Sequence, residues 1–130
     1  MVSRVRGSDH VYLDVLMVDD QLNVASSTAD VLRSDGLVVE TATTVDDALQ
    51  VIASSDIQCV ILDHHLAGDD GGRLLDSAGH LPPVIVMSGM DRDALVEMQA
   101  TYGNQLFACL TKPVGPLTLI ETVRSAIGSK

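Results

Sequence analysis

The sequence predicts an α/β fold in which helices cover both faces of one parallel β-sheet. Five short apolar runs, rich in valine, isoleucine and leucine, alternate with longer segments whose apolar residues recur at helical spacing. The short runs are mostly apolar throughout, as strands covered on both faces require. With 130 residues, of which 46% are hydrophobic, the chain can build one such domain but not two ordinary ones.

The predicted strands and helices alternate along the chain. The strands are expected at residues 12–18, 37–41, 59–62, 84–87 and 107–110. A first helix over residues 22–35 ends before Gly36, because glycine adopts the left-handed conformation without steric cost. A second helix begins near Thr44, where Thr44-Val-Asp-Asp47 resembles a capping box, and its buried stripe is Ala48, Leu49 and Ile52.

Three further helices follow. The third, over residues 72–78, is short because two glycines precede it. Asp91 can cap a fourth helix, which continues to about residue 101 and stops at Gly103. Pro116 suits the first position of the fifth helix, which is expected to end at Gly128 and to bury Leu117, Ile120, Val123 and Ile127.

The charge and the apolar pattern exclude several functions. The formal net charge of -10 opposes binding to nucleic acid, and the only near-pair of basic residues, Arg4 and Arg6, lies close to the N-terminus. No apolar stretch has the roughly twenty residues of a membrane span, and no signal peptide is present, so we expect a cytoplasmic protein. Cys59 and Cys109 lie inside apolar runs, which favours reduced core thiols. We expect a flexible tail over residues 1–10 and the domain over residues 11–128.

Polar side chains follow four of the five predicted strands at the point where each strand ends. Asp19 and Asp20 follow the first strand, Asp63 the third, Ser88 the fourth and Lys112 the fifth. The carboxyl ends of parallel strands meet at one edge of a sheet, and folds of this kind bind their ligands there. We therefore expect these residues to converge.

The predicted convergence has a chemical consequence. Three carboxylates in one partly desolvated crevice repel each other unless positive charge balances them. Mg²⁺ is the natural cation, because it binds a few carboxylate oxygens and shares its other positions with water and phosphate. With Lys112 and the hydroxyl of Ser88, this set suits phosphoryl transfer to a carboxylate, which forms an acyl phosphate.

Taken alone, an Asp-Asp pair is more often a solvated turn, and Asp69 and Asp70 are interpreted as loop or capping acids.

From Val11 to about Ile127 the sequence resembles the receiver domain of two-component response regulators. The motifs are Leu-Met-Val-Asp19-Asp20-Gln, Val-Ile-Leu-Asp63, Met-Ser88-Gly89 and Lys112-Pro113, whose peptide bond is usually cis in that family. The resemblance implies a doubly wound, flavodoxin-like (βα)5 sandwich with strand order 2-1-3-4-5. It also implies that Asp63 is the phosphoacceptor, helped by Ser88 and Lys112.

The same resemblance implies a cofactor and a phosphodonor. Mg²⁺ would be bound by Asp19, Asp20, Asp63 and the backbone carbonyl of His65. The donor would be a sensor histidine kinase or a histidine phosphotransfer protein. The domain would catalyse its own phosphorylation and dephosphorylation at Asp63, and we hypothesise that the side chain of His65 tunes how long the phosphoryl group survives.

The sequence departs from the family pattern at two positions. Cys109 stands three residues before the lysine, where the family usually has the tyrosine or phenylalanine that moves on activation. Phe107 lies two residues earlier, on the same face of a regular strand, and could take part of that role. Ala67 replaces a frequent proline, which should loosen the loop after Asp63 slightly.

Two other functions stay open from the sequence. A phosphatase of the haloacid dehalogenase type also uses an aspartyl phosphate, but it would need an aspartate where His65 stands, and it normally has a cap domain. A receiver-like interaction module would never be phosphorylated and would dock through its fourth helix, fifth strand and fifth helix. Because no segment has the pattern of an output domain, we expect a downstream effector protein on that face, a homodimer, or a relay of phosphate onward.

Overall fold

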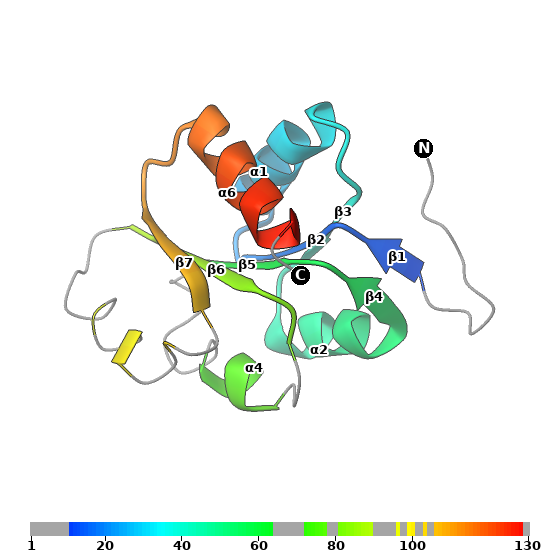
Figure 1. Cartoon of the computed structure of the whole chain (residues 1–130). Coiled ribbons are helices and arrows are strands. Elements are labelled where there is room, and N and C mark those ends of the chain that lie inside the picture. The colour runs from blue at the N-terminus through cyan, green and yellow to red at the C-terminus, as the bar shows by residue number, and fades with distance from the viewer. Residues whose placement is uncertain are drawn as a thin grey trace.

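In a computed structural model of the chain, one parallel sheet lies between two layers of helices (Figure 1). The structure describes residues 11–63, 72–77, 81–89, 96, 99–100, 103 and 106–128. The expected tail, the loop that contains His65, Ala67, Asp69 and Asp70, and most of the expected fourth helix lie outside these residues. None of the helices in the described part of the chain has the length and hydropathy of a membrane span.

Every predicted strand and helix that falls in the described ranges has a counterpart. In chain order the elements are β1 (Val11–Leu13), β2 (Val15–Val18), α1 (Leu22–Ser34), β3 (Val39–Ala42), α2 (Val45–Ser54), β4 (Ser55–Ile57), β5 (Val60–Asp63), α4 (Gly72–Ser77), β6 (Val84–Ser88), β7 (Leu106–Thr111) and α6 (Pro116–Gly128). The short strand β4 was not predicted.

The main sheet has the order β3-β2-β5-β6-β7, and its strands are all parallel. This is the predicted order 2-1-3-4-5, with β2 counted as the first strand. The chain therefore enters this sheet at an inner strand, β2, adds the edge strand β3, and then crosses to the other side of β2 to add β5, β6 and β7 in turn. This reversal brings the ends of β2 and β5 together at the carboxyl edge, where folds of this type bind ligands.

Alternate residues of the central strands pack on opposite faces of the sheet. On β2, Val15 and Met17 belong to the core cluster that includes residues of α1 and α6, whereas Leu16 and Val18 belong to the cluster that includes residues of α2 and α4. Figure 1 shows these two layers of helices on opposite sides of the sheet. All four side chains are fully buried. This two-sided burial is the reason that the strands are apolar on successive residues instead of alternating with polar ones.

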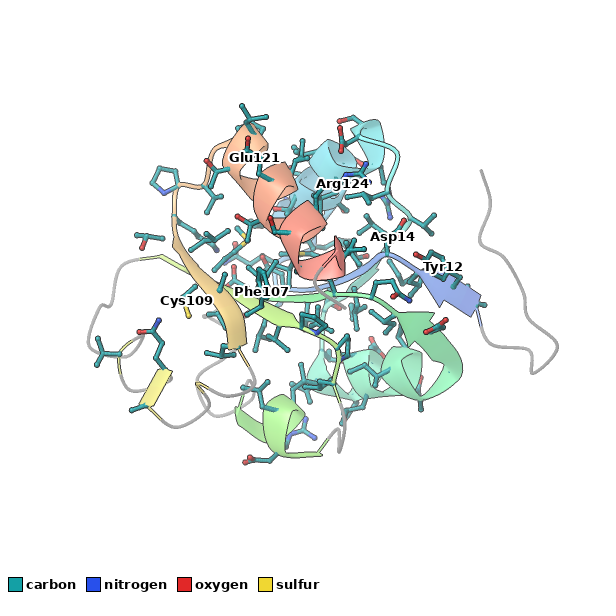
Figure 2. All side chains as sticks on the ribbon, in the orientation of Figure 1. Tyr12, Asp14, Phe107, Cys109, Glu121 and Arg124 are labelled. Atoms are coloured by element: carbon teal, nitrogen blue, oxygen red, sulfur yellow. The ribbon has the colours of Figure 1, made fainter. Side chains whose placement is uncertain are left out.

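The first predicted strand is divided in two at Asp14, so the prediction of one strand over residues 12–18 was wrong. Oδ2 of Asp14 accepts the backbone N–H of Val38 at 2.7 Å, and Oδ1 accepts the hydroxyl of Tyr12 at 2.7 Å. Figure 2 shows Tyr12 on β1 and Asp14 between the two strands. The Asp14 carboxylate thus accepts a hydrogen bond from the segment that leads into β3. The residues before Asp14 form β1, which pairs with β4 in a separate two-stranded sheet.

The helix ends follow the local sequence. Gly36 has a φ of 90°, a conformation that favours glycine, and α1 ends two residues before it, as predicted. At the start of α2, Oγ1 of Thr44 accepts the backbone N–H of Asp47 at 3.0 Å. This bond is one half of the predicted capping box, and it satisfies a donor that a helix start otherwise leaves free.

The buried face of α6 differs from the prediction. Leu119, Val123 and Ala126 are buried, whereas Leu117 is 68% exposed, so the assignment of Leu117 to the core was wrong. Residues 119, 123 and 126 are spaced by four and three positions and therefore share one side of the helix. Leu117 lies two positions before Leu119, about 200° around the helix axis, so it faces away from the sheet.

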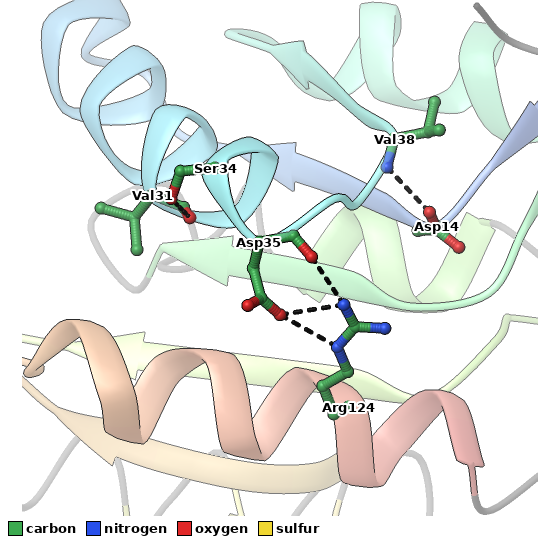
Figure 3. A network of polar contacts seen from close by, with 6 residues as sticks. All are labelled: Asp14, Val31, Ser34, Asp35, Val38 and Arg124. Atoms are coloured by element: carbon green, nitrogen blue, oxygen red, sulfur yellow. Dashed lines mark hydrogen bonds and ion pairs between the residues drawn. The ribbon is translucent and has the colours of Figure 1, made fainter. Parts of the chain in front are cut away.

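Arg124 joins α6 to the end of α1. Its Nε and Nη2 donate to Oδ2 of Asp35 at 3.1 and 2.9 Å, and Nη2 also donates to the backbone carbonyl of Asp35 at 2.7 Å (Figure 3). Asp35 caps the C-terminal end of α1, so the guanidinium group also satisfies a carbonyl at the end of that helix. The contact fixes two helices that cover the same face of the sheet.

Candidate functional site

An ion pair marks the carboxyl edge of the sheet. Asp63 is the last residue of β5, and Lys112 directly follows β7. Nζ of Lys112 donates a hydrogen bond to Oδ2 of Asp63, although β6 lies between the two strands. The Asp63 side chain is buried and that of Lys112 is 25% exposed. The structure thus brings these two predicted site residues together, and the peptide bond between Lys112 and Pro113 is cis, as expected.

Asp19 is the second buried acid at this edge. It follows β2, the strand that pairs with β5, and it is 1% exposed. Its backbone N–H donates to the carbonyl of Ala42 at 3.0 Å, and its Oδ1 accepts the backbone N–H of Gln21 at 2.9 Å. Its Oδ2 is buried, and no described residue donates a hydrogen bond to it. Oδ1 of this carboxylate is therefore fixed by a hydrogen bond, whereas Oδ2 is available to bind a ligand.

The two buried acids influence each other. The pKa of Asp19 is raised to about 6, mainly by burial and also by the negative charge of Asp63, while the Gln21 amide and Lys112 act in the opposite direction. Asp19 and Asp63 are therefore close neighbours whose ionisation together needs more positive charge than Lys112 alone supplies.

The third predicted carboxylate differs from the other two in its exposure to solvent. Asp20 is exposed, and among the described residues no three acidic, imidazole or thiol groups gather in a way that could hold a metal ion. Two of the three expected carboxylates, Asp19 and Asp63, meet in the described structure. The remaining predicted ligand, the carbonyl of His65, lies outside the described residues.

Ser88 stands at the expected strand end, and only its backbone is described. It is the last residue of β6 and pairs in register with Thr111 of β7, the residue before Lys112. Asp63 pairs with Met87, the residue before Ser88. The main chain of Ser88 is thus placed between the strands that carry Asp63 and Lys112, at the same edge.

Cys109 and Phe107 both lie on β7 but in different surroundings (Figure 2). Cys109 packs against the apolar cluster of the α2 and α4 layer, and burial raises the pKa of its thiol. The pairing of β6 with β7 shifts register between Val84 and Ile85, so Phe107 is an extra residue opposite that step. The regular alternation that placed Phe107 with Cys109 is therefore interrupted, and Phe107 is 40% exposed and belongs to neither core cluster.

Two groups that build the site were not predicted, the amide of Gln21 and the carbonyl of Ala42. Both are backbone groups, and every residue except proline carries the same pair, so the sequence contains no side-chain signal for them. The only hint is the position of Gln21, directly before the apolar periodicity of α1 begins.

The arrangement suits a reaction at a carboxylate oxygen. Asp63 is buried at a strand end with a cation against one oxygen, and Asp19 places a second buried acid beside it. No proton needs to be removed from an ionised carboxylate before it attacks an electrophile, so the site can work without a general base. The extra negative charge of a phosphoryl group would be balanced by an ammonium group and a divalent cation.

The sequence and the fold match one protein family. The sequence model of a family described as the response regulator receiver domain matches residues 15–124. Among curated proteins, the chain is 30% identical over 115 residues to the regulatory protein VanR of Enterococcus faecium, which covers 87% of this chain and 49% of VanR. It is 32% identical over 108 residues to the sensor histidine kinase RcsC of Escherichia coli, which covers 82% of this chain and 11% of RcsC.

Solved structures support the same assignment. The fold matches a CheY-like response regulator receiver domain protein of Methanospirillum hungatei with a TM-score of 0.78 and 25% identity, over 91% of this chain and 95% of the other. The chain spans about half the length of VanR and about a tenth of RcsC. The likeness therefore concerns one domain of those longer proteins.

Proposed function

Because the chain belongs to the response regulator receiver family, we propose that Asp63 accepts a phosphoryl group with the help of Lys112, Ser88 and Mg²⁺. The chain is a receiver domain of two-component signalling. The ion pair between Lys112 and Asp63 is the observation that carries the proposal, because it selects one carboxylate and supplies it with a cation. We place the receiver domain at residues 11–128, with residues 1–10 preceding it.

The proposed reaction transfers a phosphoryl group from a phosphohistidine to Asp63. A carboxylate oxygen of Asp63 attacks phosphorus, the bond between phosphorus and the histidine nitrogen breaks, and the electron pair of that bond returns to the imidazole. The product is an acyl phosphate. Lys112 would move its contact from the carboxylate to a phosphoryl oxygen, and the hydroxyl of Ser88 would donate to another. These contacts stabilise charge that develops during the transfer.

The residues at this edge fit a magnesium ion. Oδ2 of Asp19 is buried, has no donor among the described residues and neighbours the Asp63 carboxylate. Mg²⁺ binds through one or two carboxylates and keeps several waters, so two buried acids suffice for its protein ligands. Asp19 and Asp63 would hold the ion, with the exposed Asp20 and the His65 carbonyl as further ligands. When bound, the ion neutralises phosphoryl charge.

The phosphodonor is proposed to be a sensor histidine kinase or a histidine phosphotransfer protein. One of the relatives, RcsC, is itself named a sensor histidine kinase, and the part that resembles this chain is about a tenth of it. The proposed outputs are binding of an effector protein on the surface of β7 and α6, self-association, or transfer of the phosphoryl group onward. A phosphatase of the haloacid dehalogenase type has no support from the family match.

A phosphodonor titration tests this function. Acetyl phosphate, with and without Mg²⁺, would be added to the wild type and to Asp63→Asn, with mass spectrometry and hydroxylamine sensitivity as readouts for an acyl phosphate. The matched control is Asp56→Asn, the same change at β4 in the other, two-stranded sheet. We expect Mg²⁺-dependent addition of one phosphoryl group to the wild type and to the control, and none to Asp63→Asn.

Two results would contradict the proposal. Phosphorylation of Asp63→Asn at the wild-type rate would place the acceptor elsewhere. A wild type that shows neither phosphorylation nor a Mg²⁺-dependent spectral response to beryllofluoride would favour the unphosphorylated interaction module instead.

A further inference from the structure

One backbone amide holds half of the buried carboxylate of Asp19. The N–H of Gln21 donates to Oδ1 of Asp19 at 2.9 Å, and the N–H of Asp19 itself donates to the carbonyl of Ala42 at 3.0 Å. The main chain and the side chain of Asp19 are therefore both anchored. The carboxylate cannot rotate about its Cβ–Cγ bond without losing the bond to Gln21.

The position of the Gln21 amide is fixed by α1. Gln21 is the residue before the helix, and its carbonyl accepts the N–H of Ala25 at 3.0 Å. Its side chain is exposed and makes no capping hydrogen bond. The contribution of Gln21 to the site is thus carried by its amide group, while its side chain can be changed independently.

The anchored carboxylate leaves one oxygen for a ligand. Oδ2 of Asp19 is buried and has no donor among the described residues, and it neighbours Asp63. A buried carboxylate oxygen without a donor costs free energy unless a proton or a cation compensates it. A cation is therefore the expected ligand of this oxygen.

We propose that the backbone amide of Gln21 is a positioning group that presents Asp19 to a cation through Oδ2 alone and so favours Mg²⁺ over Ca²⁺. Mg²⁺ demands a nearly ideal octahedron, to which a carboxylate held in one orientation is suited. Ca²⁺ accepts variable geometry and binds both oxygens of a carboxylate readily, so it gains less from a fixed orientation. The inference rests on the proposed function, because it concerns the ion that would assist phosphorylation of Asp63.

The test removes the amide hydrogen and keeps the side chain. In the full chain, the α-hydroxy analogue of glutamine at position 21 replaces the amide by an ester, and Gln21→Pro removes the same N–H by ordinary mutagenesis. Gln21→Ala is the matched control, because it keeps the amide and loses the side chain. The dissociation constants for Mg²⁺ and Ca²⁺ would be measured from backbone amide resonances in two-dimensional NMR, which also report whether each variant is folded.

We expect Gln21→Ala to bind both ions like the wild type. The ester variant should lose on the order of tenfold in affinity for Mg²⁺, as is typical when a partner that orients a metal ligand is removed, and should lose less for Ca²⁺. Gln21→Pro should show the same change in the ratio of the two constants. A general loosening of the site would lower the affinities for both ions by the same factor.

The failures can be told apart. An ester variant with the wild-type ratio of Mg²⁺ to Ca²⁺ affinity would overturn the inference, whether the affinities stay equal or fall together, and the role of Asp63 would stand. A wild type that binds no Mg²⁺ in the same titration would overturn the metal site in the proposed function itself.

Discussion

Lys112 forms an ion pair with Asp63 across an intervening strand, because Asp63 ends β5, Lys112 directly follows β7, and β6 lies between these two strands. In sequence they are 49 residues apart. The cation is thus brought to the acid by the sheet alone, with each residue placed by its own strand end. This is the relationship on which the proposed chemistry depends.

Removal of the Lys112 cation should slow phosphorylation. Lys112→Ala is expected to reduce the rate with acetyl phosphate by roughly two orders of magnitude, since a preorganised donor to developing charge is lost. The measurement is the initial rate of acyl phosphate formation at saturating Mg²⁺. Lys112→Arg keeps the charge but not the compact ammonium group, so its rate should lie between those of the wild type and Lys112→Ala. An unchanged rate in Lys112→Ala would contradict the role of the ion pair.

Asp19 should make stability depend on pH. Its pKa is about 6 in the folded chain against 3.8 for a free side chain, so the folded state binds the proton more tightly. The resulting stabilisation is complete below about pH 4 and is lost as the pH rises through about 6. Asp19→Asn should therefore be more stable than the wild type above this range, by up to about 3 kcal/mol, and the difference should vanish in acid.

Urea unfolding at several pH values checks this prediction. The difference between the wild type and Asp19→Asn cancels the carboxylates that both proteins share. Mg²⁺ should stabilise the wild type at pH 7 and reduce the advantage of the variant, because the ion compensates the same charge. A difference that does not change with pH would mean that Asp19 does not hold its proton more tightly in the folded state.

The sequence was sufficient to predict where Asp63 and Lys112 meet. Both follow apolar runs, and the ends of parallel strands share an edge, so the topology alone implies their proximity. It was not sufficient to predict that Asp20, which belongs to the same motif as the buried Asp19, is exposed. Two adjacent residues at a strand end point in different directions, and the sequence does not determine which one turns inward.

The errors in the fold prediction have a similar origin. Leu117 and Leu119 are both apolar residues of one helical segment, and only the packing of α6 on the sheet decides which of them is buried. Asp14 breaks the first strand because its carboxylate meets the amide of Val38, a contact between residues 24 positions apart. Local patterns carry no information about such a distant donor.

The contact between Arg124 and Asp35 should contribute modestly to stability. Both side chains are more than a third exposed, at 53% and 39%, so solvent screens the ion pair. The loss in Arg124→Ala is expected to be about 1 kcal/mol, which includes the hydrogen bond to the Asp35 carbonyl. A double-mutant cycle with Asp35→Ala, followed by urea unfolding, isolates the coupling. Arg73→Ala, which removes the exposed ion pair with Asp46, should cost less.

The N-terminal cap of α2 should contribute about as much to the free energy of unfolding as the contact between Arg124 and Asp35. Thr44→Ala removes the oxygen that accepts the Asp47 amide and is expected to cost about 1 kcal/mol. Thr44→Ser keeps an oxygen at the same place and should cost only a small part of that. Thermal or urea unfolding of the two variants gives the comparison. Equal losses would show that the methyl group, and not the cap, is what matters at this position.

The two thiols should differ in reactivity. Cys59 is fully buried, whereas Cys109 is half-buried and burial raises the pKa of its thiol. Only the thiolate is alkylated, so a raised pKa keeps Cys109 in its unreactive form to a higher pH than a free cysteine. At pH 8 we expect iodoacetamide to modify Cys109 more slowly than a model peptide and Cys59 only after unfolding. Cys109→Ser and Cys59→Ser assign the two sites by mass spectrometry. Rapid alkylation of Cys109 in the folded protein would contradict the packing of this residue against the α2 and α4 layer.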